Sequence, residues 1–159
     1  MKPAILLARG VVITALALGL SDLLAAPPGV PVQPEVVDIR TGEVLYAQHC
    51  ASCHGARLEG QQDWRKQAAE GVYPAPPHDE TGHTWHHGDG LLFAYTKYGG
   101  EATFAARGLK GIKSGMPGFG HALSDQEIWN ILAFIKSTWS ERMRKVQAKR
   151  TEAEQLDSP

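Results

Sequence analysis

Both cysteines of this 159-residue chain lie in one short segment, and a histidine directly follows the second. Cys50, Cys53 and His54 form a C-x-x-C-H pattern. A thioredoxin-like redox pair would need a strand–helix–strand pattern around the cysteines, and the sequence shows none. A zinc site needs four ligands, so a second pair would have to be histidines. The third possible chemistry is covalent haem attachment, for which C-x-x-C-H is the signature.

The spacing of the motif favours haem. Two thiols two residues apart on a helical turn can each add to a vinyl group on one edge of a porphyrin, and the next residue then brings its imidazole under the iron. A disulfide across this spacing would close a very small loop and stabilise little. We therefore predict one covalent haem c, cycling between Fe2+ and Fe3+, attached through Cys50 and Cys53 with His54 as an iron ligand.

The second axial ligand is sought among three methionines. Met1 begins a segment with the features of a leader, and Met143 lies in a highly charged segment. Met116 lies between glycines and precedes Pro117, so its backbone can approach a haem closely in a stiffened turn. A methionine in such a loop is a poor core filler, whereas His/Met ligation of haem iron is common. We predict that His54 and Met116 are the metal ligands.

These motifs resemble the class I, mono-haem cytochromes c, of a short bacterial periplasmic type, over about residues 41–140. The matching positions are Gly42, Tyr46, the C-x-x-C-H motif, Gly115-Met116-Pro117-Gly118-Phe119 and Trp129. The resemblance implies an all-α fold of about three to five helices, with long loops wrapped round one covalently attached haem. It also implies that the first and last helices cross closely at Gly42, with Trp129 packed against it.

The resemblance carries further expectations for the site. A proline carbonyl should accept a hydrogen bond from the ring N–H of His54, and three prolines are candidates: Pro74, Pro76 and Pro77. The iron should be six-coordinate, and pass one electron rather than bind a substrate. Water should be excluded by apolar side chains, for which the candidates are Phe93, Phe119, Trp129 and Ile131.

Local signals predict three helices that would position these residues. Thr41 can cap a first helix that runs into the cysteine motif, and Asp89 can cap a short helix ended by glycines 99–100. Ser124 and Glu127 form a capping box at the start of the last helix. An apolar stripe at helical spacing follows, made of Ile128, Ile131, Leu132 and Ile135.

The chain divides into four segments by composition. Residues 1–26 have a positive start and a short apolar run, which predicts a signal peptide or a retained anchor and hence a periplasmic location. Residues 27–40 are a proline-rich linker, and residues 41–140 are the cytochrome c domain. Residues 141–159 are a charged tail, for which disorder or a frayed helical extension is expected.

Three further groups of residues have open interpretations. The histidines of residues 78–87 could hold a second metal, hydrogen-bond within a compact loop, or contact the haem propionates together with Trp85. Trp64 and Arg65 are also candidate propionate partners. Four basic residues could steer an acidic partner or form a solvated face: Lys97, Arg107, Lys110 and Lys113.

The formal charge of −1 and the absence of a basic stripe exclude nucleic acid as an expected partner. We predict a one-electron carrier, not itself an enzyme, whose partners are redox proteins and which meets a membrane only through its leader or a docked complex. One alternative is a haem subunit docked to a dehydrogenase or oxidase. Another is a haem enzyme or gas sensor, if Met116 does not hold the iron. A copper-handling module is a weaker alternative.

Overall fold

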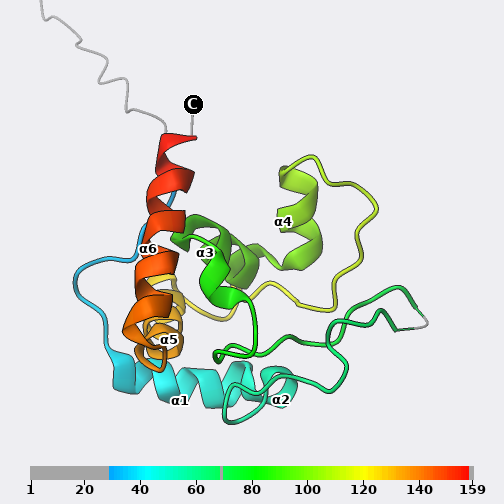
Figure 1. Cartoon of the computed structure of the whole chain (residues 1–159), viewed down its shortest axis with the longest axis horizontal. Helices are drawn as coiled ribbons and strands as arrows, with labels where there is room; N and C mark the ends of the chain where they lie inside the picture. Colours follow the sequence, from blue (N-terminus) through cyan, green and yellow to red (C-terminus); the bar gives the residue numbers. More distant parts are fainter. Residues whose placement is uncertain (1–28, 69, 158–159) are drawn as a thin grey trace, which may run out of the picture.

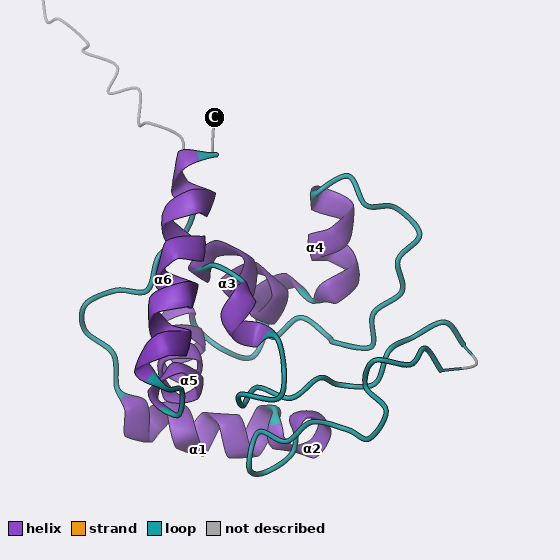
Figure 2. Ribbon diagram, in the orientation of Figure 1, coloured by secondary structure: helices purple, strands orange, loops and turns teal. Residues whose placement is uncertain are grey.

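The computed structural model describes residues 29–68 and 70–157, and within them the chain is built of helices and loops without a strand (Figures 1 and 2). The predicted leader lies outside the described residues. The helices are α1 (Ile39–His49), α2 (Ala51–His54), the 3-10 helix η1 (Thr84–His86), α3 (Asp89–Tyr98), α4 (Gly100–Ala106), α5 (Asp125–Ser137) and α6 (Glu141–Leu156). The all-α class is confirmed, and the described residues form six α-helices where about three to five were expected, because α4 and α6 were not predicted.

Helix α1 begins earlier than predicted. Its N-cap is Asp38, whose carboxylate accepts hydrogen bonds from the backbone N–H of Thr41 at 3.0 Å and from the Thr41 hydroxyl at 2.8 Å. Thr41 was predicted as the cap and instead lies in the first turn. The backbone N–H of Asp38 donates to Oδ1 of Asn130 at 2.9 Å, so the start of α1 is tied to α5.

The predicted close crossing of the first and last domain helices is confirmed. A methyl group on Gly42 of α1 would lie 1.9 Å from the carbonyl oxygen of Asn130 in α5. The backbones therefore touch, and only glycine fits between them. The ring of Trp129 stacks on Phe93 of α3, with 4.5 Å between centroids, and its contact with Gly42 stays a prediction.

Helix α5 agrees with its prediction. Ser124 Oγ accepts a hydrogen bond from the backbone N–H of Glu127, and the Glu127 carboxylate accepts one from the backbone N–H of Ser124, so both halves of the capping box are present. The apolar stripe is buried and belongs to the main core; its members are Ile128, Ile131, Leu132 and Ile135. This helix therefore carries the central apolar face of the domain.

Helices α3 and α4 meet at a glycine pair. Gly88 is the N-cap of α3, so Asp89 is its first residue rather than its cap. Gly99 ends α3 at a φ of +86°, a left-handed value that favours glycine. Gly100 then begins α4 at once, in a region where no helix was predicted.

The segment after residue 140 is an ordered helix through Leu156, and the expectation of disorder or fraying is wrong there. Ser140 caps α6 by accepting a hydrogen bond from the backbone N–H of Met143 at 3.3 Å. The buried residues of α6 are Met143, Gln147 and Thr151, which recur every four residues. The charged residues between these positions make the buried stripe hard to recognise from the sequence. Helix α6 lies along α3 and η1 (Figure 1).

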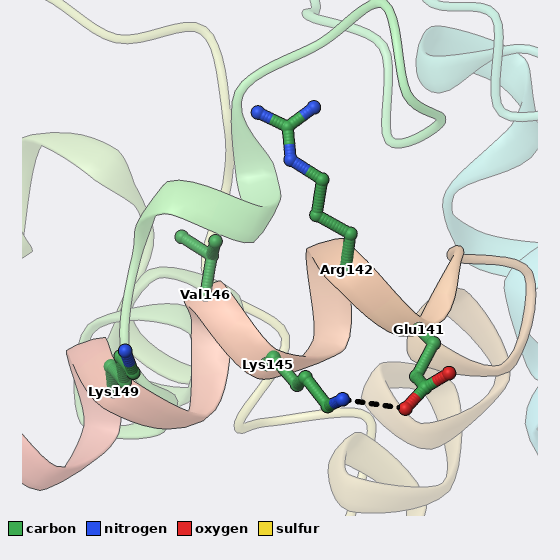
Figure 3. Close-up of a pocket in the computed structure, with 5 residues that line it drawn as sticks. All are labelled: Glu141, Arg142, Lys145, Val146 and Lys149. Carbon is green, nitrogen blue, oxygen red and sulfur yellow. Dashed lines mark ion pairs between the residues drawn. The ribbon is translucent and has the colours of Figure 1, made fainter.

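The outward surface of α6 is polar. A hollow on it is lined by Glu141, Arg142, Lys145, Val146 and Lys149 (Figure 3). The carboxylate of Glu141 pairs with the ammonium of Lys145 at 2.7 Å, and both side chains are largely exposed. This hollow contains none of the residues predicted to hold the haem.

Residues 29–38 run along the domain rather than away from it. The backbone N–H of Gln33 donates to Asp89 at 2.9 Å, and the side chain of Gln126 donates to the carbonyl of Val36 at 3.1 Å. These contacts attach the proline-rich segment to α3 and α5. No helix in residues 29–157, residue 69 aside, has the length and apolar character needed to cross a membrane.

Candidate haem site

The C-x-x-C-H motif occupies the junction of α1 and α2. The backbone N–H groups of Cys53 and His54 both donate to the carbonyl of Cys50, at 3.1 and 2.9 Å, which forms the helical turn that the spacing predicts. Cys50 is buried, Cys53 is exposed, and the two are not joined by a disulfide. Burial raises the pKa of the Cys50 thiol to about 11, with the neighbouring Cys53 adding to the shift.

His54 is buried, with 7% of its surface exposed. Its Nδ1 lies 2.8 Å from the carbonyl oxygen of Pro76. A carbonyl only accepts, so Nδ1 must carry the proton, and the lone pair of Nε2 is left to bind a metal. Burial lowers the pKa of His54 more than this hydrogen bond raises it, which favours the neutral, ligating form. Of the three candidate prolines, Pro76 occupies the predicted position.

The loop that follows His54 is held tightly. The Tyr46 hydroxyl donates to the carbonyl of Gly55 at 2.8 Å, and the backbone N–H of Gly60 donates to the carbonyl of His54 at 2.7 Å. A methyl group on Gly60 would lie 2.4 Å from the backbone nitrogen of Pro77. The chain on both sides of the His54–Pro76 bond is thereby fixed in place.

The loop around Met116 is attached to the junction of α3 and α4. The carbonyl of Met116 accepts a hydrogen bond from the backbone N–H of Gly100 at 3.0 Å, and the backbone N–H of Phe119 donates to Thr96 at 2.9 Å. A methyl group on Gly118 would lie within 3 Å of the backbone of α3. Met116 itself is half-buried. The loop is therefore anchored on both sides of the methionine, and its ligation of iron stays a prediction.

The two loops of the site also touch each other. The Lys113 ammonium donates to the carbonyl of Glu70 at 3.2 Å. A methyl group on Gly115 would lie 3.3 Å from Cγ1 of Val72. The segment that follows C-x-x-C-H and the segment that leads to Met116 thus meet through side-chain and backbone contacts.

Two buried polar atoms near the histidine-rich loop suit a haem. Nε1 of Trp85 and Nδ1 of His83 are buried and have no hydrogen-bond partner among the described residues. A buried donor without a partner is costly, and haem propionates are acceptors. Trp64 stacks on His83 with centroids 5.2 Å apart, and the Arg65 guanidinium lies 4.0 Å from the Trp64 ring centroid. The residues present therefore fit the predicted propionate contacts.

The second-metal hypothesis gains no support. No group of three or more His, Cys, Asp or Glu side chains in the described part of the chain could hold a metal ion. The histidines contact other groups instead: His83 meets His87 edge-on, and Nδ1 of His78 lies 2.8 Å from the Thr84 hydroxyl. Burial, followed by neighbouring histidines and arginines, lowers the pKa of His87 to about 4.

Three of the four candidate steering residues have partners within the chain. Lys97 pairs with Asp125 at 2.6 Å and Arg107 with Glu154 at 3.6 Å, and Lys113 is bonded to Glu70. The two ion pairs offset much of the positive field that a steering role needs, whereas the backbone carbonyl of Glu70 leaves the charge of Lys113 in place. Steering of an acidic partner stays an untested prediction.

Sequence reasoning missed two residues beside His54, the predicted iron ligand. The ring of His78 stacks on that of His54, with centroids 4.1 Å apart and planes 22° apart. Trp139 was also missed; its Nε1 donates to the carbonyl of His78 at 2.7 Å. His78 was noticed only as part of a histidine-rich stretch, because a contact between residues 54 and 78 has no local signal.

Comparison with known proteins agrees with this architecture. Residues 39–139 match the family model described as Cytochrome c, and the chain belongs to this family. It therefore carries covalent haem c, for which Cys50 and Cys53 have the attachment spacing, and its domain serves haem-based electron transfer. The match ends before α6 begins.

One relative among characterised proteins is a thiosulfate dehydrogenase of Stutzerimonas stutzeri (strain A1501). It is 34% identical over 114 residues, which cover 70% of this chain. The aligned part is 31% of that relative, so this chain matches less than a third of its length. No solved structure matches significantly.

Proposed function

We propose that the protein is a one-electron carrier with a single haem c, joined to Cys50 and Cys53 and ligated by His54 and Met116. The observation that carries the proposal is the short contact between Nδ1 of His54 and the carbonyl of Pro76. It fixes the tautomer whose Nε2 can bind iron, and it sits next to two correctly spaced thiols. When bound, haem supplies reversible Fe2+/Fe3+ chemistry.

The residues of the chain itself orient the two predicted iron ligands and keep His54 away from water. The carbonyl of Pro76 holds the proton on Nδ1 of His54, and burial lowers the pKa of that ring, which favours its neutral form. Hydrogen bonds from Gly100 and Phe119 anchor the Met116 loop, so its thioether belongs to a backbone with little freedom. Sulfur ligation favours the reduced state, which suits a carrier of relatively high potential.

Optical spectroscopy with a matched pair of methionine variants tests the ligation. The native protein should show the weak long-wavelength band of thioether-to-iron(III) ligation when oxidised, and should not bind carbon monoxide when reduced. Met116→Leu should lose the band and bind carbon monoxide. Met143→Leu is the control, because Met143 is buried in α6 and is not a predicted ligand.

Each outcome separates the candidate functions. A closed site in the native protein that opens only in Met116→Leu supports an electron carrier. Ready carbon monoxide binding by the native protein would contradict ligation by Met116 and favour a haem enzyme or sensor. Loss of the band in Met143→Leu rather than in Met116→Leu would reassign the ligand.

A second candidate function rests on the similarity to part of a thiosulfate dehydrogenase. In this alternative, the chain is the haem-bearing part of an enzyme or a subunit docked to one. Addition of thiosulfate to the oxidised, purified protein distinguishes the two. Reduction of the haem at a rate that depends on thiosulfate would favour the enzyme, and a lack of reduction would favour a carrier that needs a protein donor.

We further propose that the carrier works outside the cytoplasm and exchanges electrons with other redox proteins. This rests on the leader-like residues 1–26 and on covalent haem attachment, which prevents loss of the cofactor outside the cell. Fractionation of cells expressing the full chain tests it. Haem-stained protein in the periplasmic fraction supports the proposal, and haem-stained protein confined to the cytoplasm contradicts it.

A further inference from the structure

The ring of His78 lies almost parallel to the ring of His54. Their centroids are 4.1 Å apart and their planes differ by 22°. At this separation the two rings are in van der Waals contact, so neither can tilt toward the other without a clash. His78 therefore forms a wall beside the predicted iron ligand.

That wall is itself held from several sides. The backbone N–H of His78 donates to the carbonyl of Leu58 at 2.8 Å, and its carbonyl accepts from Nε1 of Trp139 at 2.7 Å. Its Nδ1 lies 2.8 Å from the hydroxyl of Thr84. The ring of Tyr46 meets it edge-on, with centroids 6.3 Å apart. His78 thus has a fixed backbone and a fixed ring.

The hydrogen bond to Pro76 does not fix the tilt of the His54 imidazole plane. A carbonyl oxygen accepts hydrogen bonds over a broad range of directions, so the bond at Nδ1 does not by itself set the tilt of the imidazole plane. The stacked ring of His78 does restrict that tilt. The orientation of the plane decides how the imidazole π orbitals overlap with the iron d orbitals.

We propose that His78 is a positioning residue, which fixes the imidazole plane of His54 by stacking against its face. This inference rests on the proposed role of His54 as an axial ligand. The aromatic ring, rather than the polar contact with Thr84, is the part of His78 that does this. Ligand-orienting groups outside the coordination sphere generally tune the metal that they surround.

Two substitutions of His78 separate the ring from its polar contact. His78→Phe keeps an aromatic ring and loses the contact with Thr84. His78→Asn has no ring and can keep a polar contact with Thr84. The readout is the set of electron paramagnetic resonance g-values of the oxidised holoprotein, which report the ligand plane independently of electron-transfer activity. Haem content and far-UV circular dichroism confirm folding, and His121→Asn at an exposed position is the control.

The inference predicts native g-values for His78→Phe and His121→Asn, and shifted or broadened g-values for His78→Asn. Native g-values in His78→Asn would overturn it. Shifted g-values in His78→Phe with native g-values in His78→Asn would assign the effect to the contact with Thr84, and equal shifts in both variants would show that an aromatic ring alone is not sufficient; either result would overturn the inference. Should His78→Asn fail to accumulate, His78→Leu replaces it with the same expectations.

Failure of the proposed function would look different. A native protein without the low-spin signature of imidazole-ligated iron would contradict the role of His54 itself, and with it this inference. A native signature that is insensitive to loss of the ring would contradict only the role of His78.

Discussion

The crossing of α1 and α5 makes Gly42→Ala the most informative single perturbation of the fold. The added methyl group would lie 1.9 Å from the carbonyl oxygen and 2.5 Å from the carbonyl carbon of Asn130, whereas ordinary contact begins near 3.4 Å. Both obstacles are backbone atoms of a buried helix, so neither can rotate away. The helices must separate, or the start of α1 must unravel.

The magnitude follows from two opposing terms. Alanine is a better helix former than glycine by about 1 kcal/mol. Overpacking of a well-packed core costs typically about 1–3 kcal/mol, and an overlap this deep against backbone belongs at or beyond the upper end, at about 3–5 kcal/mol. The expected net loss in the free energy of unfolding is therefore about 2–4 kcal/mol. For a domain of this size, that corresponds to a fall in Tm of roughly 6–16 °C.

The assay is urea unfolding of the holoprotein, followed by far-UV circular dichroism and tryptophan fluorescence. Gly90→Ala in α3 is the control, since its methyl group would meet side-chain atoms, Cγ1 of Val30 at 2.1 Å and Oε2 of Glu154 at 3.1 Å, rather than the backbone of a packed helix. Gly90→Ala should cost clearly less than Gly42→Ala. A Gly42→Ala protein within about 0.5 kcal/mol of the native stability, a difference typical of neutral surface changes, would refute the close helix crossing.

Three further perturbations have expected outcomes. Burial raises the pKa of Asp89, but the Lys136 ammonium and several hydrogen bonds lower it by more, so its pKa in the folded state lies below 3.8. The ionised carboxylate therefore contributes its full stabilisation above about pH 4, and this stabilisation is lost as the pH falls through the folded-state pKa. Asp89→Asn should cost about 3 kcal/mol at neutral pH and flatten this acid limb in unfolding measurements; an unchanged limb would contradict the pairing with Lys136. Tyr46→Phe removes the donor to Gly55 and should cost about 1 kcal/mol in urea unfolding, whereas no loss would show that the bond contributes nothing. Ser124→Ala removes the N-cap of α5 and should cost about 1 kcal/mol, with Ser124→Asp retaining stability; equal losses in both variants would argue against capping.

Much of the candidate site was predictable because its signals are local. Haem attachment is predicted by the spacing of Cys50, Cys53 and His54 on one helical turn. Helix α5 is predicted by the capping residue Ser124 and by the helical spacing of the apolar residues that follow it. Each signal depends on residues no more than a few positions apart, which physical rules relate directly to structure.

Helix α6 was mispredicted for an equally physical reason. Its buried residues are only Met143, Gln147 and Thr151, and two of these are polar. A stripe that mixes methionine with hydrogen-bonding side chains does not stand out from a run of charges. Helix α6 packs on η1 and α3, and at α3 the Asp89 carboxylate accepts a hydrogen bond from the Gln147 side chain while the Asp89 backbone N–H donates to the Thr151 hydroxyl.

By itself, the sequence determined the chemistry of attachment, the all-α class and the helix that carries the core, because these depend on spacing and local period. Only the tertiary structure decided which proline accepts the hydrogen bond from His54 and that His78 stacks on the same ring. It also decided that the carbonyl of Asn130 meets Gly42. These contacts join residues that lie 22, 24 and 88 positions apart in the printed sequence, and long-range packing chooses among partners that are locally equivalent.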